Sequence, residues 1–171
     1  IHAVSVAINP VIETFQSDWP EAEVYSLLED SLPNDLQNAG KIDNAIINRF
    51  KRLADYAANT GADGILFTCS AFGVAIEAAA AAHAPLPVLK PNEAMFEEAM
   101  GMGDRIGMIA TFHPSIPSMA QEFDEMTAAA QSLAKLETTC VPEAMTALRD
   151  GDAETHNRLV AGAVDQLANT D

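Results

Sequence analysis

Residues 61–73 have the sequence GADGILFTCSAFG, in which a short, mainly apolar run at residues 64–68 follows Gly61 and precedes Cys69. The apolar run, residues 64–68, is predicted to be a buried strand, and Gly61 stands where the preceding helix needs a C-cap. The Ala-rich segment 72–82 that follows predicts a helix. A continuous apolar strand between two helices is typical of a parallel sheet that helices cover on both faces.

The rest of the first half shows the same alternation of strands and helices. Residues 2–8 (HAVSVAI), 22–28 (AEVYSLL) and 87–90 (PVLK) are predicted strands. Residues 43–60 are a predicted helix, because apolar side chains recur there at spacings of three and four residues. These side chains are Ile46, Ile47, Phe50, Leu53, Ala54 and Ala57.

The second half starts the alternation again. Residues 105–111 and 136–141 are predicted strands, and residues 118–134 and 153–170 are predicted helices. Four residues at the end of one predicted helix in each half also match at a constant offset of 110: Asp55, Ala58, Asn59 and Thr60 recur as Asp165, Ala168, Asn169 and Thr170.

Chance alone can produce one such match in an Ala-rich chain, but the shared order of elements favours an internal duplication. The predicted fold class is therefore α/β, with two pseudo-symmetric parallel-sheet domains of flavodoxin-like or Rossmann-like type. We place the domains at residues 1–93 and 94–171, with the join somewhere in residues 91–104.

The duplication also predicts that residues are missing at both ends of the sequence. The chain begins inside a predicted strand and ends where the first copy would enter its 64–68 strand. We therefore expect the second domain to be incomplete at its C-terminal end. The counterpart of Cys69 would then lie near position 179.

Composition excludes several classes of protein. The net charge of −16, with nine Lys and Arg, argues against nucleic-acid binding. The apolar runs are too short for a membrane span, and two distant cysteines favour a reducing, cytoplasmic compartment. Metal-site and nucleotide-binding motifs are absent from the sequence, so we expect no cofactor.

Cys69 is the candidate catalytic residue. It lies at the carboxyl end of a predicted parallel strand, where α/β folds place their ligands, and the dipole of the following helix favours a thiolate there. The alternative is an inert packing cysteine. The flanking hydroxyls of Thr68 and Ser70 favour a site, because pure packing would favour Val or Ala at both positions.

Other candidates follow the remaining predicted strands. Asn9 ends the first strand and Thr111 its counterpart, and each offers either a ligand-binding group or ordinary turn chemistry. Glu93 follows the fourth strand, as a helix-start carboxylate or a site residue. Cys140 is expected to be packing at the periphery.

Three segments together resemble the aspartate/glutamate/hydantoin racemase superfamily: ADGILFTCSAFG around Cys69, RIGMIAT at the start of the second domain, and PLPVLKPNEAM before the join. The resemblance implies a cofactor-independent enzyme with its active site between two domains and one catalytic cysteine from each. Related members decarboxylate arylmalonates or isomerise maleate. We also expect a small carboxylate substrate and a homo-oligomer.

The chemistry of such a site suits this composition. Inverting a stereocentre needs a base on one face of the carbon and an acid on the other. Helix N-termini and hydroxyls hold the carboxylate, so few cations are needed. Without a second cysteine, a one-base decarboxylase or isomerase is the alternative activity. A non-catalytic carboxylate-binding protein of the same fold is the alternative outside enzymes.

Overall fold

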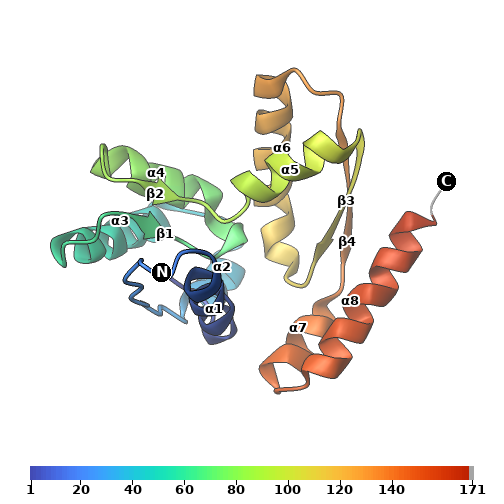
Figure 1. The fold of residues 1–171 in the computed structure, drawn as a ribbon, viewed down its shortest axis with the longest axis horizontal. Coiled ribbons are helices and arrows are strands. Elements are labelled where there is room, and N and C mark those ends of the chain that lie inside the picture. Colours follow the sequence, from blue (N-terminus) through green and yellow to red (C-terminus); the bar gives the residue numbers. More distant parts are fainter. Residues whose placement is uncertain (170–171) are drawn as a thin grey trace. The chain divides into compact units, whose positions relative to one another are not determined.

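The computed structural model describes residues 1–169, which fold as a mixed α/β chain rich in helix (Figure 1). The chain divides into two compact units, Ile1–Pro91 and Asn92–Asp171. Of the residues in the repeated pattern, Thr170 lies outside the described residues, as does Asp171. The pseudo-symmetry of the two halves stays a prediction.

The first unit consists of short strands and longer helices. Its elements in chain order are η1 (Ser5–Ala7), α1 (Ile8–Asp18), α2 (Leu32–Ala39), α3 (Asn44–Asn59), β1 (Ile65–Leu66), η2 (Ser70–Phe72), α4 (Gly73–His83) and β2 (Val88–Leu89).

Four extended segments of the first unit lie side by side and parallel. β1 pairs in parallel with β2. On the other side of β1, the backbone of Ile1 donates to Leu66 (2.6 Å) and accepts from Thr68 (3.0 Å). His2 in turn forms a parallel bridge with Leu28. The spatial order is thus the segment around Leu28, the segment around His2, β1 and β2, and all four carboxyl ends meet at one edge of the sheet.

The predicted strands at residues 2–8 and 22–28 are largely wrong. The chain leaves the sheet after Ala3, because residues 5–18 form η1 and α1. Ile8, Ile12 and Phe15 recur at helical spacing, and Pro10 lies in the first turn of α1, where its missing N–H leaves no helical bond unmade. These local preferences prevail over the β-rich composition that suggested a strand.

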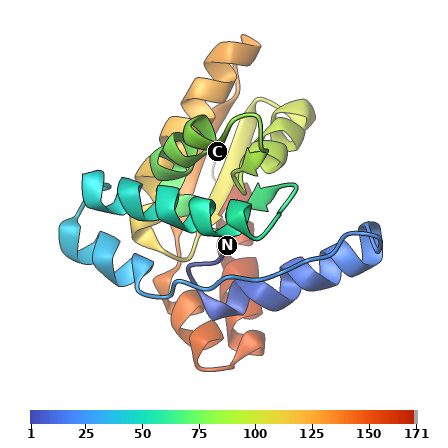
Figure 2. The same ribbon diagram turned by 90° about the vertical axis from the view of Figure 1, so that its left-hand side faces the viewer.

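The predicted helices around β1 are confirmed. α3 begins after Asp43, whose carboxylate accepts from the Ile46 N–H at 2.9 Å. Gly61 follows the helix at φ +88°, the left-handed conformation expected just beyond a helix end. α4 packs against α3 (Figure 2). Phe50 of α3 forms the centre of this core, with ring centroids 5.0 Å from Phe67 and 4.9 Å from Phe72.

The second unit follows its predicted order closely. Its elements are α5 (Glu93–Met102), β3 (Arg105–Ala110), η3 (His113–Ser115), α6 (Ile116–Ala130), β4 (Lys135–Cys140), α7 (Pro142–Arg149) and α8 (Ala153–Ala168). Strands β3 and β4 pair in parallel from Arg105 and Lys135 to Ala110 and Cys140. α5 and α7 were not predicted. α6 ends earlier than expected, since Gln131 adopts a left-handed φ of 52°.

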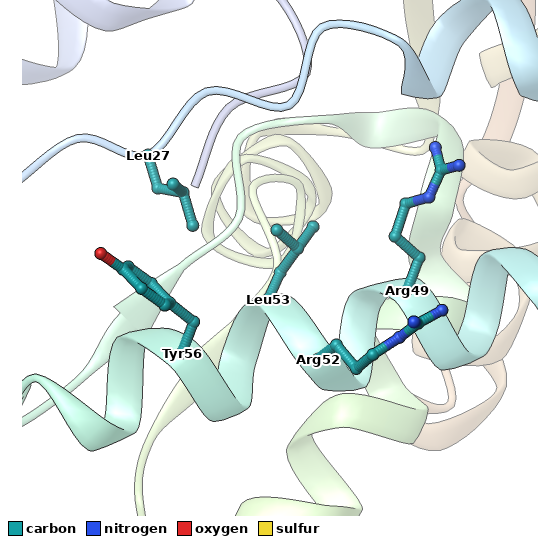
Figure 3. A pocket seen from close by; sticks show the side chains of 5 residues that line it. All are labelled: Leu27, Arg49, Arg52, Leu53 and Tyr56. Carbon is teal, nitrogen blue, oxygen red and sulfur yellow. The ribbon is translucent and has the colours of Figure 1, made fainter.

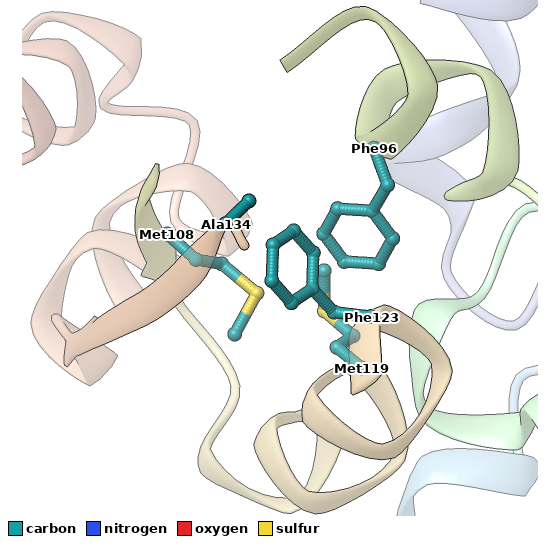
Figure 4. Packing of buried hydrophobic residues seen from close by; sticks show 5 residues of the cluster. All are labelled: Phe96, Met108, Met119, Phe123 and Ala134. Carbon is teal, nitrogen blue, oxygen red and sulfur yellow. The ribbon is translucent and has the colours of Figure 1, made fainter. Parts of the chain in front are cut away.

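Two contacts define the packing of the second unit. Phe96 of α5 meets Phe123 of α6 edge to face at 5.3 Å, beside Met108, Met119 and Ala134 (Figure 4). On β3, a Cβ atom added to Gly107 would lie 2.6 Å from the Leu167 side chain of α8. Glycine at this position therefore permits α8 to approach the strand closely.

Candidate functional site

The sequence Thr68-Cys69-Ser70 forms the turn between β1 and η2, at the carboxyl edge of the first sheet. Cys69 is the N-cap of η2, which leads directly into α4. All three side chains are half-buried. The structure thus places Cys69 at the strand-to-helix junction that the sequence predicted, with a hydroxyl on each side.

The protonation state of Cys69 is the opposite of the predicted one. Burial raises the pKa of the Cys69 thiol to about 11, while a hydrogen bond from the Ala71 backbone N–H lowers it by a smaller amount. The penalty for burying a thiolate therefore exceeds the benefit of one donor at the helix start. At neutral pH Cys69 is a thiol and carries a proton.

His2 is a site residue that sequence reasoning missed. Its side chain is 3% exposed and contacts two hydroxyls, Thr68 Oγ1 at 3.0 Å from Nδ1 and Ser26 Oγ at 3.3 Å from Nε2. Burial lowers the pKa of His2. The imidazole is therefore neutral at pH 7. The only signal in the sequence was a lone histidine at the start of the predicted strand at residues 2–8.

Asn9 does not occupy the position predicted for it, whereas Glu93 follows β2 at the start of a helix, as expected. Asn9 is exposed in the first turn of α1 instead of ending a strand, so it does not belong to the carboxyl edge of the sheet. Glu93 is exposed at the first position of α5, which agrees with its alternative role as a helix-start carboxylate. The buried polar residue in this segment is Asn92, whose amide donates to Glu122 Oε2 at 2.9 Å.

The second unit has its own carboxyl sheet edge. Thr111 directly follows β3, as predicted, and Cys140 is the last residue of β4, opposite Ala110 in the register. Cys140 is half-buried, and burial, followed by the charge of Glu143, raises its pKa. Thr111 and Cys140 thus share one sheet edge, whereas sequence reasoning had treated Cys140 as peripheral.

A family model described as Asp/Glu/Hydantoin racemase matches residues 13–171. The chain belongs to the Asp/Glu/hydantoin racemase family. No match to a curated protein or to a solved structure was found. Membership of this racemase family supports a racemase- or isomerase-type function in general terms.

In this racemase-family chain, an open groove lies between α3 and the extended segment before Leu28. Its volume is about 490 Å³, and Leu27 faces Leu53 and Tyr56 across it (Figure 3). Two arginines complete the lining, Arg49 and Arg52.

Arg49 is held by acidic and hydroxyl groups around the groove. Its Nη1 lies 3.1 Å from Glu29 Oε2, 2.6 Å from Asp35 Oδ2 and 3.0 Å from Ser31 Oγ. Two carboxylates therefore compensate its charge, which makes this arginine a weak attractor for a further anion. The carboxyl edge at Cys69 remains the better candidate site.

Metal-ligand clusters and membrane-spanning helices are both absent from the described residues. Among residues 1–169, no group of three or more His, Cys, Asp or Glu side chains is arranged to hold a metal ion. Within the same range, every helix is too short or too polar to cross a bilayer.

Proposed function

We propose that this protein transfers a proton at the carbon alpha to a carboxylate, without a cofactor, and that Cys69 is one proton-transfer group. The observation that carries this proposal is the place of Cys69, between two hydroxyls at the carboxyl edge of a parallel sheet. Membership of the racemase family supports the same reaction class. An amino acid, a hydantoin or a related acid is the proposed substrate.

The protonated thiol defines the direction of the step. Because its pKa is raised to about 11, Cys69 begins the reaction as the acid. A group on the opposite face of the carbon removes the α-proton, and the electron pair passes into the enolate. Cys69 then gives its proton to the near face of the carbon, a C–H bond forms, and the sulfur keeps the S–H electron pair as a thiolate.

Donors beside Cys69 stabilise the negative charge in this proposal. The hydroxyls of Thr68 and Ser70 and backbone N–H groups at the start of η2 bind the carboxylate and the enolate oxygen. Thr111, which follows β3 in the second unit, stays a proposed substrate-binding residue because its hydroxyl is a donor of the same kind. Such donors suit a chain in which Lys and Arg number nine among 171 residues.

Deuterium incorporation from D₂O at the α-carbon tests the proposal. The protein is incubated with amino acids, hydantoins and dicarboxylates, and substrate is analysed by NMR. We expect exchange in the parent protein and a loss of at least about a hundredfold in Cys69→Ser, because the acid itself is removed. Thr60→Ala, which removes a hydroxyl at the end of α3, is the control and keeps the parent rate. Equal exchange by parent and Cys69→Ser would exclude Cys69 from the proton transfer.

The raised pKa also favours one alternative, decarboxylation of an arylmalonate-type substrate. Loss of CO₂ leaves an electron pair on the α-carbon, and a thiol that is protonated at rest can supply the proton directly. Release of CO₂ without exchange of a substrate α-proton would identify this activity. Binding of carboxylates with neither reaction would identify a binding protein. Homo-oligomerisation and a cytoplasmic location stay predictions.

A further inference from the structure

The hydrogen bonds of the buried His2 connect three segments of the first sheet. Ser26 lies beside the Leu28 bridge, His2 follows Ile1, and Thr68 precedes Cys69. His2 therefore reaches the candidate site through one side chain only, with its Nδ1 3.0 Å from Thr68 Oγ1. The role of this contact depends on whether Nδ1 or Nε2 of His2 carries the imidazole proton.

A neutral imidazole has one N–H donor and one acceptor nitrogen, so two arrangements are available. In the first, Nδ1–H donates to Thr68 Oγ1, and the Ser26 hydroxyl donates to Nε2. In the second, the Thr68 hydroxyl donates to Nδ1, and Nε2–H donates to Ser26. The first leaves the Thr68 proton available to another group, while the second commits it to His2.

The surroundings of Thr68 favour the first arrangement. The Thr68 hydroxyl also lies within donating distance of the Ile1 carbonyl, although that contact is long, at 3.5 Å. The same carbonyl already accepts the Thr68 backbone N–H at 3.0 Å. A hydroxyl that accepts from Nδ1–H and donates weakly to a satisfied carbonyl can turn its proton to a ligand at little cost.

We propose that His2 is a positioning residue that, as the Nδ1–H tautomer, holds the Thr68 hydroxyl as a hydrogen-bond donor to the substrate carboxylate beside Cys69. The inference rests on the proposed function, since it identifies how that site binds its carboxylate. A carboxylate only accepts hydrogen bonds. If the Thr68 hydroxyl donated its proton to His2, only its lone pairs would face the carboxylate, and they would repel it.

The neutrality of His2 is part of this arrangement. Burial lowers its pKa, so the ring keeps a single proton at neutral pH. An imidazolium would donate from both nitrogens and would force the Ser26 hydroxyl to turn away from Nε2. In this arrangement the Ser26 hydroxyl donates to Nε2, Nδ1–H of His2 donates to Thr68, and the Thr68 hydroxyl keeps its proton for the substrate.

The first test is independent of activity. Long-range ¹H–¹⁵N correlation spectra of the parent protein, recorded with and without malonate as the probe, distinguish the two tautomers of His2. We expect Nδ1–H in both samples and expect Ser26→Ala to weaken that preference, because Nε2 loses its donor. Observation of Nε2–H in the parent overturns the inference, even if the protein exchanges α-protons.

The second test uses kinetics to separate positioning from a general structural role. We expect His2→Leu to lower α-proton exchange about 10- to 100-fold, a cost typical of removing the partner that orients a site group. His2→Asn keeps a donor near the Nδ1 position and restores most of the loss. Thr60→Ala, which removes a hydroxyl at the end of α3, is the control and leaves exchange unchanged.

The two proposals fail in different ways. If the parent neither exchanges α-protons nor decarboxylates, the proposed function fails. The role of His2 is then still decided by its tautomer and by whether His2→Leu weakens the binding of malonate. If the parent is active and His2→Leu and His2→Asn lower the exchange rate equally, then donation from Nδ1 does not matter. In that case the inference about His2 fails while the proposed function stands. Should His2→Leu not fold, the Ser26→Ala comparison and the parent spectra carry the test.

Discussion

Alkylation of Cys69 by iodoacetamide, followed against pH in a Cys140→Ser variant, tests the burial of the candidate catalytic thiol. Only the thiolate reacts, so the rate depends on the fraction of cysteine that is ionised. With a pKa of about 11 in place of the ordinary 9.0, Cys69 has roughly a hundredfold less thiolate near pH 8 than an ordinary thiol.

The raised pKa partly compensates for the lower thiolate fraction. A more basic thiolate is more nucleophilic, with a Brønsted coefficient of about 0.4–0.5. Over this pKa difference the thiolate of Cys69 therefore reacts roughly six- to tenfold faster than an ordinary thiolate. We therefore expect Cys69 to react about 10- to 15-fold more slowly than a small reference thiol of ordinary pKa, before any steric protection. The rate should rise about tenfold per pH unit and level off only near pH 11.

Mass spectrometry of samples quenched at intervals gives the rate at each pH, and Cys69→Ser shows the background of other sites. A rate that levels off at or below about pH 8.5 would refute the reasoning, because it would mean that the helix start outweighs burial. Unfolded protein in urea supplies the reference in which Cys69 has lost its burial. Its rate should then follow that of an ordinary thiol.

Two stability predictions follow from the packing of the units. Phe50→Ala removes a ring that is 1% exposed and lies between Phe67 and Phe72, so it leaves a cavity in the core. We expect it to lower the unfolding free energy, measured by urea titration, by about 3–5 kcal/mol. A loss below about 1 kcal/mol would contradict the central place of Phe50 in this core. Gly107→Ala should cost about 1–3 kcal/mol by overpacking, because its Cβ would lie 2.6 Å from Leu167. Adding Leu167→Ala should make the double variant more stable than the sum of the two single changes predicts, and simple additivity would refute the contact.

Local signals were sufficient to predict the helices and strands around Cys69. α3 combines a three- and four-residue apolar spacing with a capping carboxylate at Asp43 and a left-handed Gly61. In the second unit, β3 is mainly apolar and β4 contains the β-branched Thr138 and Thr139, and helices bound both strands. Features of this kind depend on residues within a few positions of each other, which is what a sequence pattern records.

The segment before α1 shows where local signals conflict. Residues 2–8 alternate like a strand, yet Ile8, Ile12 and Phe15 also form an apolar helical stripe. Both periodicities are present in the sequence, and only the sheet contacts of Ile1 and His2 determine where the strand stops. The prediction that Asn9 ends a strand failed for this reason.

The site itself depends on distances that the sequence does not contain. His2 meets Ser26 across 24 positions and Thr68 across 66, so neither contact leaves a local trace. The pKa of Cys69 was predicted in the wrong direction for a related reason. A helix start is visible in sequence, whereas the burial that raises the pKa to about 11 comes from the folded environment.

The raised pKa of Cys69 makes the two directions of proton transfer unequal. At pH 7 removing the thiol proton costs about 5 kcal/mol, taking 1.36 kcal/mol for each pH unit below a pKa of about 11. A free enzyme that acts first as a base would meet this cost before any chemistry, while one that acts first as an acid would not. The proposed mechanism therefore starts with the substrate's α-proton facing away from Cys69. The thiolate left after turnover is a strong base in a buried site, and it recovers its proton either from solvent or from a substrate of the opposite hand, which closes the catalytic cycle.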